Sequence, residues 1–118
     1  GEKMSVPCDQ YSSPTYVPDL VKNVFSLLEL GKNGVFHVVG SDVMSRCEFA
    51  MKAAEAFGFD AALVEPKITE ELSQKAPRPL KAGLRTDKFT RETGIVPLNV
   101  KGGLEAAKAL WLENGKKI

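Results

Sequence analysis

The sequence predicts one small α/β domain, because short strand-like segments alternate with amphipathic helices along its 118 residues. Three segments have apolar residues at helical spacing, and two short runs have the β-branched and apolar character of strands. The expected helices cover 18–30, 45–57 and 100–114, and the expected strands cover 35–39 and 61–64. The order of these elements favours an α/β layer over a bundle of helices.

Length and composition limit the classes of protein. A chain of 118 residues suffices for one domain with a core, and we expect that domain to span 1–118, with an irregular segment at 1–7 and a compact lobe at 8–118. Hydrophobic residues make up 43% and charged residues 26%, which is typical of a soluble globular protein. The net charge of +1 provides no general attraction to nucleic acid or to a membrane, and we expect neither as a partner.

The two cysteines bear on the redox compartment of the protein, and the first residues bear on the origin of its N-terminus. Cys8 and Cys47 are too few for a disulfide framework, so we expect buried, inert thiols in a reducing, cytoplasmic location. The chain begins with Gly and its first methionine is Met4. This start is typical of a processed end, an engineered end or a piece cut from a longer chain.

The first helix is expected from Pro18 to Leu30, with one apolar stripe that faces the core. Pro18 suits a first helical turn, and Gly31 suits the left-handed residue that follows a helix. The run 35–39, between Gly34 and Gly40, then predicts a strand buried on both faces. His37 lies within this run, and we expect a packed, hydrogen-bonded side chain rather than a catalytic one.

The second half of the chain carries further local signals. Ser45 and Glu48 form a capping-box pattern for the helix that ends at Gly58. Thr69 is expected to cap a short helical turn, and Thr86 is expected to cap a short helix over 87–93. The inward side of the last helix is expected to consist of Val100, Leu104, Ala107, Leu110 and Trp111.

A basic segment interrupted by prolines lies between these helices. Lys75, Arg78, Lys81, Arg85, Lys88 and Arg91 oppose only Asp87, which gives a local charge of +5. Such a segment is either a solvated face or an anion site in which arginine guanidinium groups bind phosphate oxygens.

Several kinds of catalytic chemistry are absent from the sequence. No glycine-rich dinucleotide or phosphate loop is present, and no tyrosine is followed four residues later by lysine. A single histidine without a Cys-x-x-Cys pair makes a metal site an unfavourable interpretation. We therefore expect no catalytic residues, no cofactor site and no metal site in this chain.

Four motifs in order carry a resemblance to a known family. The DQYSSPT run at 9–15, followed by Asp19-Leu20, is similar to a D-Q-x-x-x-P-T…D-L-A stretch of the dTDP-4-dehydrorhamnose reductases, which are extended short-chain dehydrogenases. The GVFHVVG run at 34–40, with Ser45 and the EFA run at 48–50, resembles the strand and helix of that family. The APRP run at 76–79 and the LEA run at 104–106 resemble its R-P segment and closing helix, so the resemblance spans about 8–112.

The resemblance implies a small strand–helix substrate-binding lobe without the Rossmann nucleotide-binding core. In this family the missing N-terminal half holds NADH or NADPH and the Tyr-x-x-x-Lys pair, and the complete enzyme reduces a dTDP-4-keto-6-deoxy sugar to dTDP-L-rhamnose. The chain would then bind a dTDP-sugar and pair with an N-terminal Rossmann domain, while being inactive alone.

The resemblance also assigns substrate-binding residues. Arg78, stiffened by Pro77 and Pro79, would contact the diphosphate, with Lys81 and Arg85 as weaker candidates for the same anion. Lys81 stands where epimerases tend to carry an acidic residue. The lip of the pocket would consist of Gln10, Tyr11, Pro14 and Thr15, whereas Asp19 would bond amide groups at its helix start.

Three alternatives remain open at the level of sequence. The lobe could belong to a nucleotide-sugar epimerase or dehydratase, which shares the R-P loop. It could act as a non-catalytic regulatory module, as the β subunit of methionine adenosyltransferase does, and this subunit also resembles the reductases. The basic loop could instead bind RNA, with strong salt dependence. Without its Rossmann half, the lobe should expose an apolar face and form homodimers or aggregate.

Overall fold

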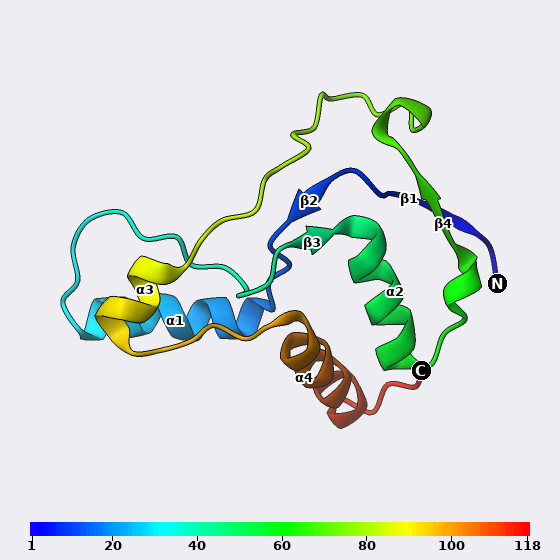
Figure 1. Cartoon of the computed structure of the whole chain (residues 1–118). Helices are drawn as coiled ribbons and strands as arrows, with labels where there is room; N and C mark the ends of the chain where they lie inside the picture. Colours follow the sequence, from blue (N-terminus) through cyan, green and yellow to red (C-terminus); the bar gives the residue numbers. More distant parts are fainter.

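The computed structural model describes all 118 residues and has two small sheets and four α-helices. Strand β1 (Met4–Pro7) pairs in parallel with β4 (Val64–Lys67), with Met4 opposite Val64. Strand β2 (Tyr11–Ser12) pairs antiparallel with β3 (Met44–Ser45). Figure 1 shows α1 and α3 at one end of the molecule and the β1–β4 pair with α2 at the other.

The N-terminal segment was expected to be irregular at 1–7, and this expectation is wrong for Met4–Pro7. These residues form β1 because β4, about 60 residues later, supplies the backbone partners. The expected strand at 61–64 is displaced along the chain. Residues Ala61–Leu63 form a 3-10 turn (η1), capped where the Asp60 carboxylate accepts from Ala62 N, and the strand begins only at Val64.

Helix α1 covers Val17–Glu29, and Gly31 follows it in the left-handed region with φ of 63°, as the sequence predicts. Its expected burial is wrong. The apolar stripe is exposed, while the side chain that α1 buries most completely is Asn23, at 1% exposure. The exposed stripe consists of Val17, Val21, Val24, Phe25 and Leu28.

The run 35–39 was predicted to be a strand buried on both faces, and this prediction is wrong because the run forms no strand. The run is irregular and unpaired, with a bend at Val39. Val35 is 77% exposed, and His37 is exposed without a hydrogen bond from its ring. The physical reason is the lack of a partner strand beside it. Its one polar contact is the bond from Lys88 Nζ to Val35 O at 2.8 Å, with the same ammonium 4.3 Å from the centre of the Phe36 ring.

Helix α2 (Arg46–Phe57) lies against the parallel strands and forms the small core with them. Ser45 caps its first turn, because Glu48 N donates to Ser45 Oγ at 3.2 Å, whereas the reciprocal bond from the Glu48 carboxylate is not formed. Cys47 packs between Val6 and Val64, and its thiol donates to Val6 O at 3.2 Å. Burial raises the pKa of the Cys47 thiol, which suits the inert role expected of it.

The last two helices begin where expected. Helix α3 (Asp87–Thr93) has no side-chain cap from Thr86. Helix α4 (Val100–Glu113) is capped by Asn99, whose side-chain oxygen accepts from Gly102 N, and by Asp42, whose carboxylate accepts from Val100 N. Val100 is buried as predicted, but Leu110 and Trp111 are exposed.

The molecule is a flat slab rather than the compact lobe expected from the sequence. Its extents are 47 × 38 × 20 Å, and only 13 of 118 residues are buried. The radius of gyration is 16.2 Å, whereas a globular chain of this length has about 13 Å. None of the helices combines the length and the apolar character that a membrane-spanning segment requires.

Candidate functional site

A polar network fixes the segment that follows β1. Both carboxylate oxygens of Asp9 accept from Thr69 N, at 3.0 and 3.1 Å, and Thr69 Oγ1 donates to Asp9 at 2.6 Å. The hydroxyl bond from Thr69 lowers the pKa of Asp9 below its ordinary value of 3.8. Gln10, at 5% exposure, donates through Nε2 to Thr69 Oγ1 and to Gln74 Oε1. The predicted lip residue Gln10 is therefore buried in a network that joins distant segments.

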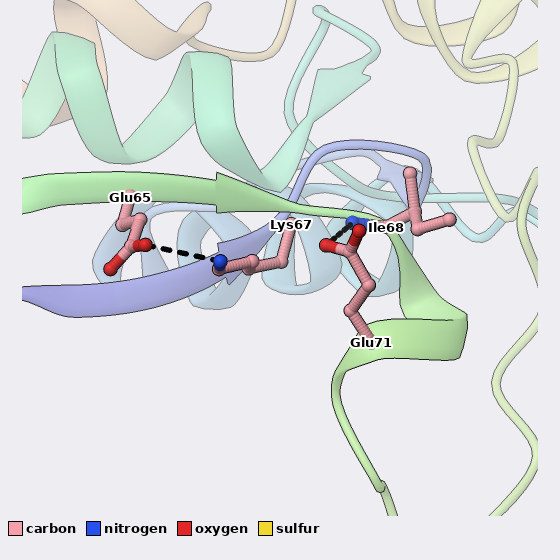
Figure 2. Close-up of polar contacts among 4 residues, drawn as sticks. All are labelled: Glu65, Lys67, Ile68 and Glu71. Atoms are coloured by element: carbon pink, nitrogen blue, oxygen red, sulfur yellow. Dashed lines mark hydrogen bonds and ion pairs between the residues drawn. The ribbon is translucent and has the colours of Figure 1, made fainter.

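Two further contacts hold the corner that leads into the basic loop (Figure 2). Glu65 and Lys67 form an ion pair at 3.1 Å, and this hydrogen bond to Glu65 raises the pKa of Lys67. One turn later, the Glu71 carboxylate accepts from Ile68 N at 3.3 Å at the start of the 3-10 turn η2 (Thr69–Glu71). The bond from Ile68 N to Glu71 thus fixes the residue that follows β4 against η2, the turn that precedes the loop.

The basic loop, which is the segment 75–86 between η2 and α3, returns to β2 and pairs with it. Tyr11 N donates to Leu80 O at 2.8 Å, and Ala82 N donates to Tyr11 O at 2.9 Å. These bonds form a parallel bridge between Tyr11 and Lys81. Paired residues of a ladder project on the same side, so the structure brings these two predicted site residues together. A third bond, from Leu84 N to Ser13 Oγ at 3.0 Å, extends the attachment.

The three candidate cations of this loop differ in their partners. Arg78 is exposed and forms neither an ion pair nor a hydrogen bond, and Lys81 is exposed with a free ammonium group. Arg85 donates through Nε to Asp87 at 2.8 Å and also contacts it through Nη2. The Arg85–Asp87 pair is highly exposed, so its contribution to stability is small.

A cavity lies elsewhere, between the β1–β4 pair and α2. It has a volume of about 970 Å³, and its lining is mostly apolar, with Phe49, Phe57 and Leu63 in its walls. Of the predicted site residues, Pro14 and Thr15 line this cavity and also a smaller one of about 160 Å³ beside α4. Neither of these two cavities is lined by Gln10, Tyr11, Arg78, Lys81 or Arg85.

Thr15 has a structural role beside the cavity. Its hydroxyl donates to Ser13 O at 2.9 Å and accepts from Gly40 N at 3.1 Å. Asp19 was expected to bond amides at its own helix start, but its carboxylate accepts from Leu98 N at 3.0 Å and from the Asn23 amide. The Asp19 side chain therefore joins α1 to the segment that precedes α4, a contact that sequence spacing does not reveal.

Sequence analysis also missed the Asp9–Thr69 pair. The only signal for Asp9 was its place beside Gln10 in the same motif. Nothing in the sequence connects Asp9 to a threonine 60 positions later.

The ends of the parallel strands lack the sequence pattern of a dinucleotide cradle. The parallel strands β1 and β4 are followed by Cys8-Asp9 and Ile68-Thr69, where a dinucleotide cradle requires a glycine-rich turn into a helix. No group of three or more His, Cys, Asp or Glu side chains is placed to hold a metal ion. Near the bridge to β2, the chain exposes the cations of Arg78 and Lys81 and the ring of Tyr11.

Comparison with known proteins gives a consistent family. The family model described as the RmlD substrate binding domain matches residues 1–110. The chain is 35% identical over 96 residues to the spore coat polysaccharide biosynthesis protein SpsK of Bacillus subtilis, covering 81% of this chain and 33% of that protein. It is 32% identical over 96 residues to the dTDP-4-dehydrorhamnose reductase of Mycolicibacterium smegmatis, covering 80% of this chain and 29% of that protein.

Solved structures agree. A dTDP-4-dehydrorhamnose reductase from Bacillus anthracis, in complex with NADP, superposes with a TM-score of 0.83 at 28% identity, covering 93% of this chain and 39% of that one. The chain thus spans about a third of the length of the relatives it matches. The match over nearly all residues, with the shared α/β architecture, shows that this chain belongs to the RmlD substrate-binding-domain family.

Proposed function

We propose that this chain binds the diphosphate of a dTDP-sugar on the face where the basic loop meets β2. The observation that carries the proposal is the bridge between Tyr11 and Lys81, because it holds the loop against the segment that follows β1. Arg78 lies three residues before Lys81 and has no protein partner, so its guanidinium is available for two phosphate oxygens. Arg85 contributes less, because Asp87 already occupies it.

The proposed face is open rather than enclosed. The Bacillus anthracis relative is much longer than this chain, and a ligand held between two parts of such a protein needs only one wall from each. In the proposal, this chain supplies the cationic wall and orients the sugar nucleotide. Pro14 and Thr15, which also line the cavity of about 970 Å³, would form the edge of this binding face.

For the whole protein we propose a nucleotide-sugar reductase that acts on a dTDP-4-keto-6-deoxy sugar in the cytoplasm. NADPH or NADH would supply the hydride from a Rossmann half, to which no residue of this chain contributes a cradle. The support is the family match together with the names of the relatives, several of which are dTDP-4-dehydrorhamnose reductases. Both cysteines are free, which suits a reducing compartment.

Isothermal titration calorimetry of the chain with dTDP tests the binding proposal. We expect weak binding that Arg78→Ala reduces by about tenfold to a hundredfold, since a charge-assisted bidentate contact contributes about 1.5–3 kcal/mol. Arg78→Lys should restore little, because an ammonium cannot reproduce the guanidinium fork. The matched control is Arg91→Ala, which removes the same charge from α3 outside the bridged loop.

Equal losses for the Arg78 and Arg91 variants would mean that only general charge attracts the nucleotide, and the proposed site would be wrong. Binding that prefers RNA to dTDP and falls steeply with salt would favour the RNA alternative instead.

A further inference from the structure

We propose that Gln10 is a positioning residue of the proposed diphosphate site, because its hydrogen bond to Gln74 holds the residue that precedes the basic loop and so places Arg78 for the phosphate oxygens. We call the bond between Gln10 and Gln74 the latch. Its role rests on the proposed function and adds to it a residue that touches no ligand and acts on affinity only through the loop.

Two neighbouring residues hold the two ends of the arc 75–79. Before the arc, Gln10 Nε2 donates to Gln74 Oε1 at 2.8 Å. After the arc, Tyr11 N donates to Leu80 O, also at 2.8 Å. Within 75–79, no backbone group bonds another backbone group. The two anchors, together with the two prolines inside the arc, therefore determine where it lies.

The donors and acceptors of the network fix the direction of the latch. An ionised carboxylate only accepts, so the single hydroxyl proton of Thr69 goes to Asp9 Oδ1 at 2.6 Å. The Thr69 oxygen then accepts from Gln10 Nε2 at 3.2 Å. The amide of Gln10 is thereby oriented with its nitrogen toward Thr69, and its second N–H is directed to an acceptor on Gln74. A flipped amide would set its oxygen against the lone pairs of the Thr69 hydroxyl.

Burial and backbone strain make the latch costly to break. Gln10 is 5% exposed, so an N–H that lost Gln74 would find no water in its place. The adjacent backbone is strained, because Ser73 has a φ of 24° and is the only residue other than glycine with a positive φ. Such a conformation persists where neighbouring contacts determine it, and the latch on the next residue is one of them. Loss of the latch should release the chain between Ser73 and the bridge to β2.

Arg78 is the cation that depends on the latch. It lies four residues after Gln74 and two before Leu80, inside the arc. A guanidinium that binds two phosphate oxygens needs a defined approach, and an arc already held in place loses less conformational entropy on binding. Lys81 is held separately by the bridge to Tyr11, so the latch should affect Arg78 more than Lys81.

Variants at the exposed end of the latch test the proposal without altering the buried Gln10. Gln74→Met removes the acceptor and Gln74→Glu keeps it, while Ala76→Met and Ala76→Glu place the same side chains two residues later in the exposed loop as matched controls. Affinity for dTDP is measured by calorimetry. We expect Gln74→Met to weaken binding about fivefold, the effect of one neutral hydrogen bond, and Ala76→Met to leave it unchanged. Gln74→Glu should bind as Ala76→Glu does, because both add one negative charge and both keep the latch.

Two further readouts separate positioning from a general loss of structure. In an Arg78→Ala background, Gln74→Met should have little further effect on affinity, because the residue that the latch positions is gone. In the absence of nucleotide, trypsin should cleave after Lys75 about fivefold faster in Gln74→Met than in the parent chain, since cleavage follows the population of the released loop. Mass spectrometry of the fragments measures the rate.

An equal loss of affinity for Gln74→Met with and without Arg78 would overturn the proposal. So would an unchanged affinity of Gln74→Met in a chain whose binding does depend on Arg78, or an unchanged rate of cleavage after Lys75. Failure of the proposed function gives a different pattern, in which Arg78→Ala itself leaves dTDP binding unchanged while Gln74→Met still accelerates the cleavage.

Discussion

At the scale of single residues, Gly40 is the position where the structure leaves no room for a side chain. A Cβ atom built there would lie 2.0 Å from Pro14 O and 3.3 Å from Leu98 O. Its amide also donates to Thr15 Oγ1. Both close neighbours are backbone atoms, which cannot move aside as a flexible side chain does, so the close approach of three segments depends on this glycine.

We predict that Gly40→Ala lowers the free energy of unfolding by about 3 kcal/mol, the upper part of the range for overpacking. Urea denaturation followed by circular dichroism measures it. The matched control is Gly31→Ala, because nothing lies within 4 Å of its Cβ and only the backbone angle of 63° is unfavourable, at a cost of about 1 kcal/mol. Equal destabilisation of the two variants would contradict the proposed contact.

At the scale of elements, the link between the end of β1 and η2 depends on ionised Asp9. The bond from Thr69 lowers the pKa of this carboxyl in the folded chain, below its ordinary value of 3.8. A depressed folded pKa means that the stabilisation is present above the unfolded value and is lost as pH falls through the folded value. The attachment of β1 to η2 should therefore weaken in acid.

We predict that Asp9→Asn destabilises the chain at neutral pH and makes its stability less sensitive to acid. Thermal denaturation at pH 7 and at about pH 3 measures the difference, since the unfolded carboxyl titrates between them. Asp60→Asn is a suitable control, because that carboxylate bonds only Ala62 N within its own turn. If Asp9→Asn keeps the full acid sensitivity of the parent chain, the link does not depend on this ionisation.

At the scale of the whole molecule, a flat slab with an apolar stripe along α1 should not stay monomeric when no partner is present. We predict association that increases with protein concentration, because burying the stripe removes apolar surface from water. Light scattering across a dilution series measures it, with Phe25→Glu expected to reduce association. Val96→Glu serves as the control on an exposed apolar residue outside α1. A monomer at every concentration would show that the exposed apolar stripe does not drive self-association.

The sequence by itself determined the local features of this protein. Ser45 and Gly58 bound α2 as predicted, and Gly31, Gly94 and Gly115 each follow a helix with positive φ. These features depend on contacts within one or two turns of the chain, so the residues that cause them stand close together in the sequence. The family motifs were visible for the same reason, since each is a short run.

Only the tertiary structure decided which segments pair and which side chains are buried. The β1–β4 pair, the bonds from Thr69 to Asp9 and the bridge from Lys81 to Tyr11 each join residues about 60 to 70 positions apart, and no local pattern specifies the partner. The same limit explains the wrong burial predictions, for α1, for 35–39 and for Leu110 and Trp111 at the end of α4. Periodicity shows that a face is apolar, but burial requires a neighbouring surface, and this chain does not supply one.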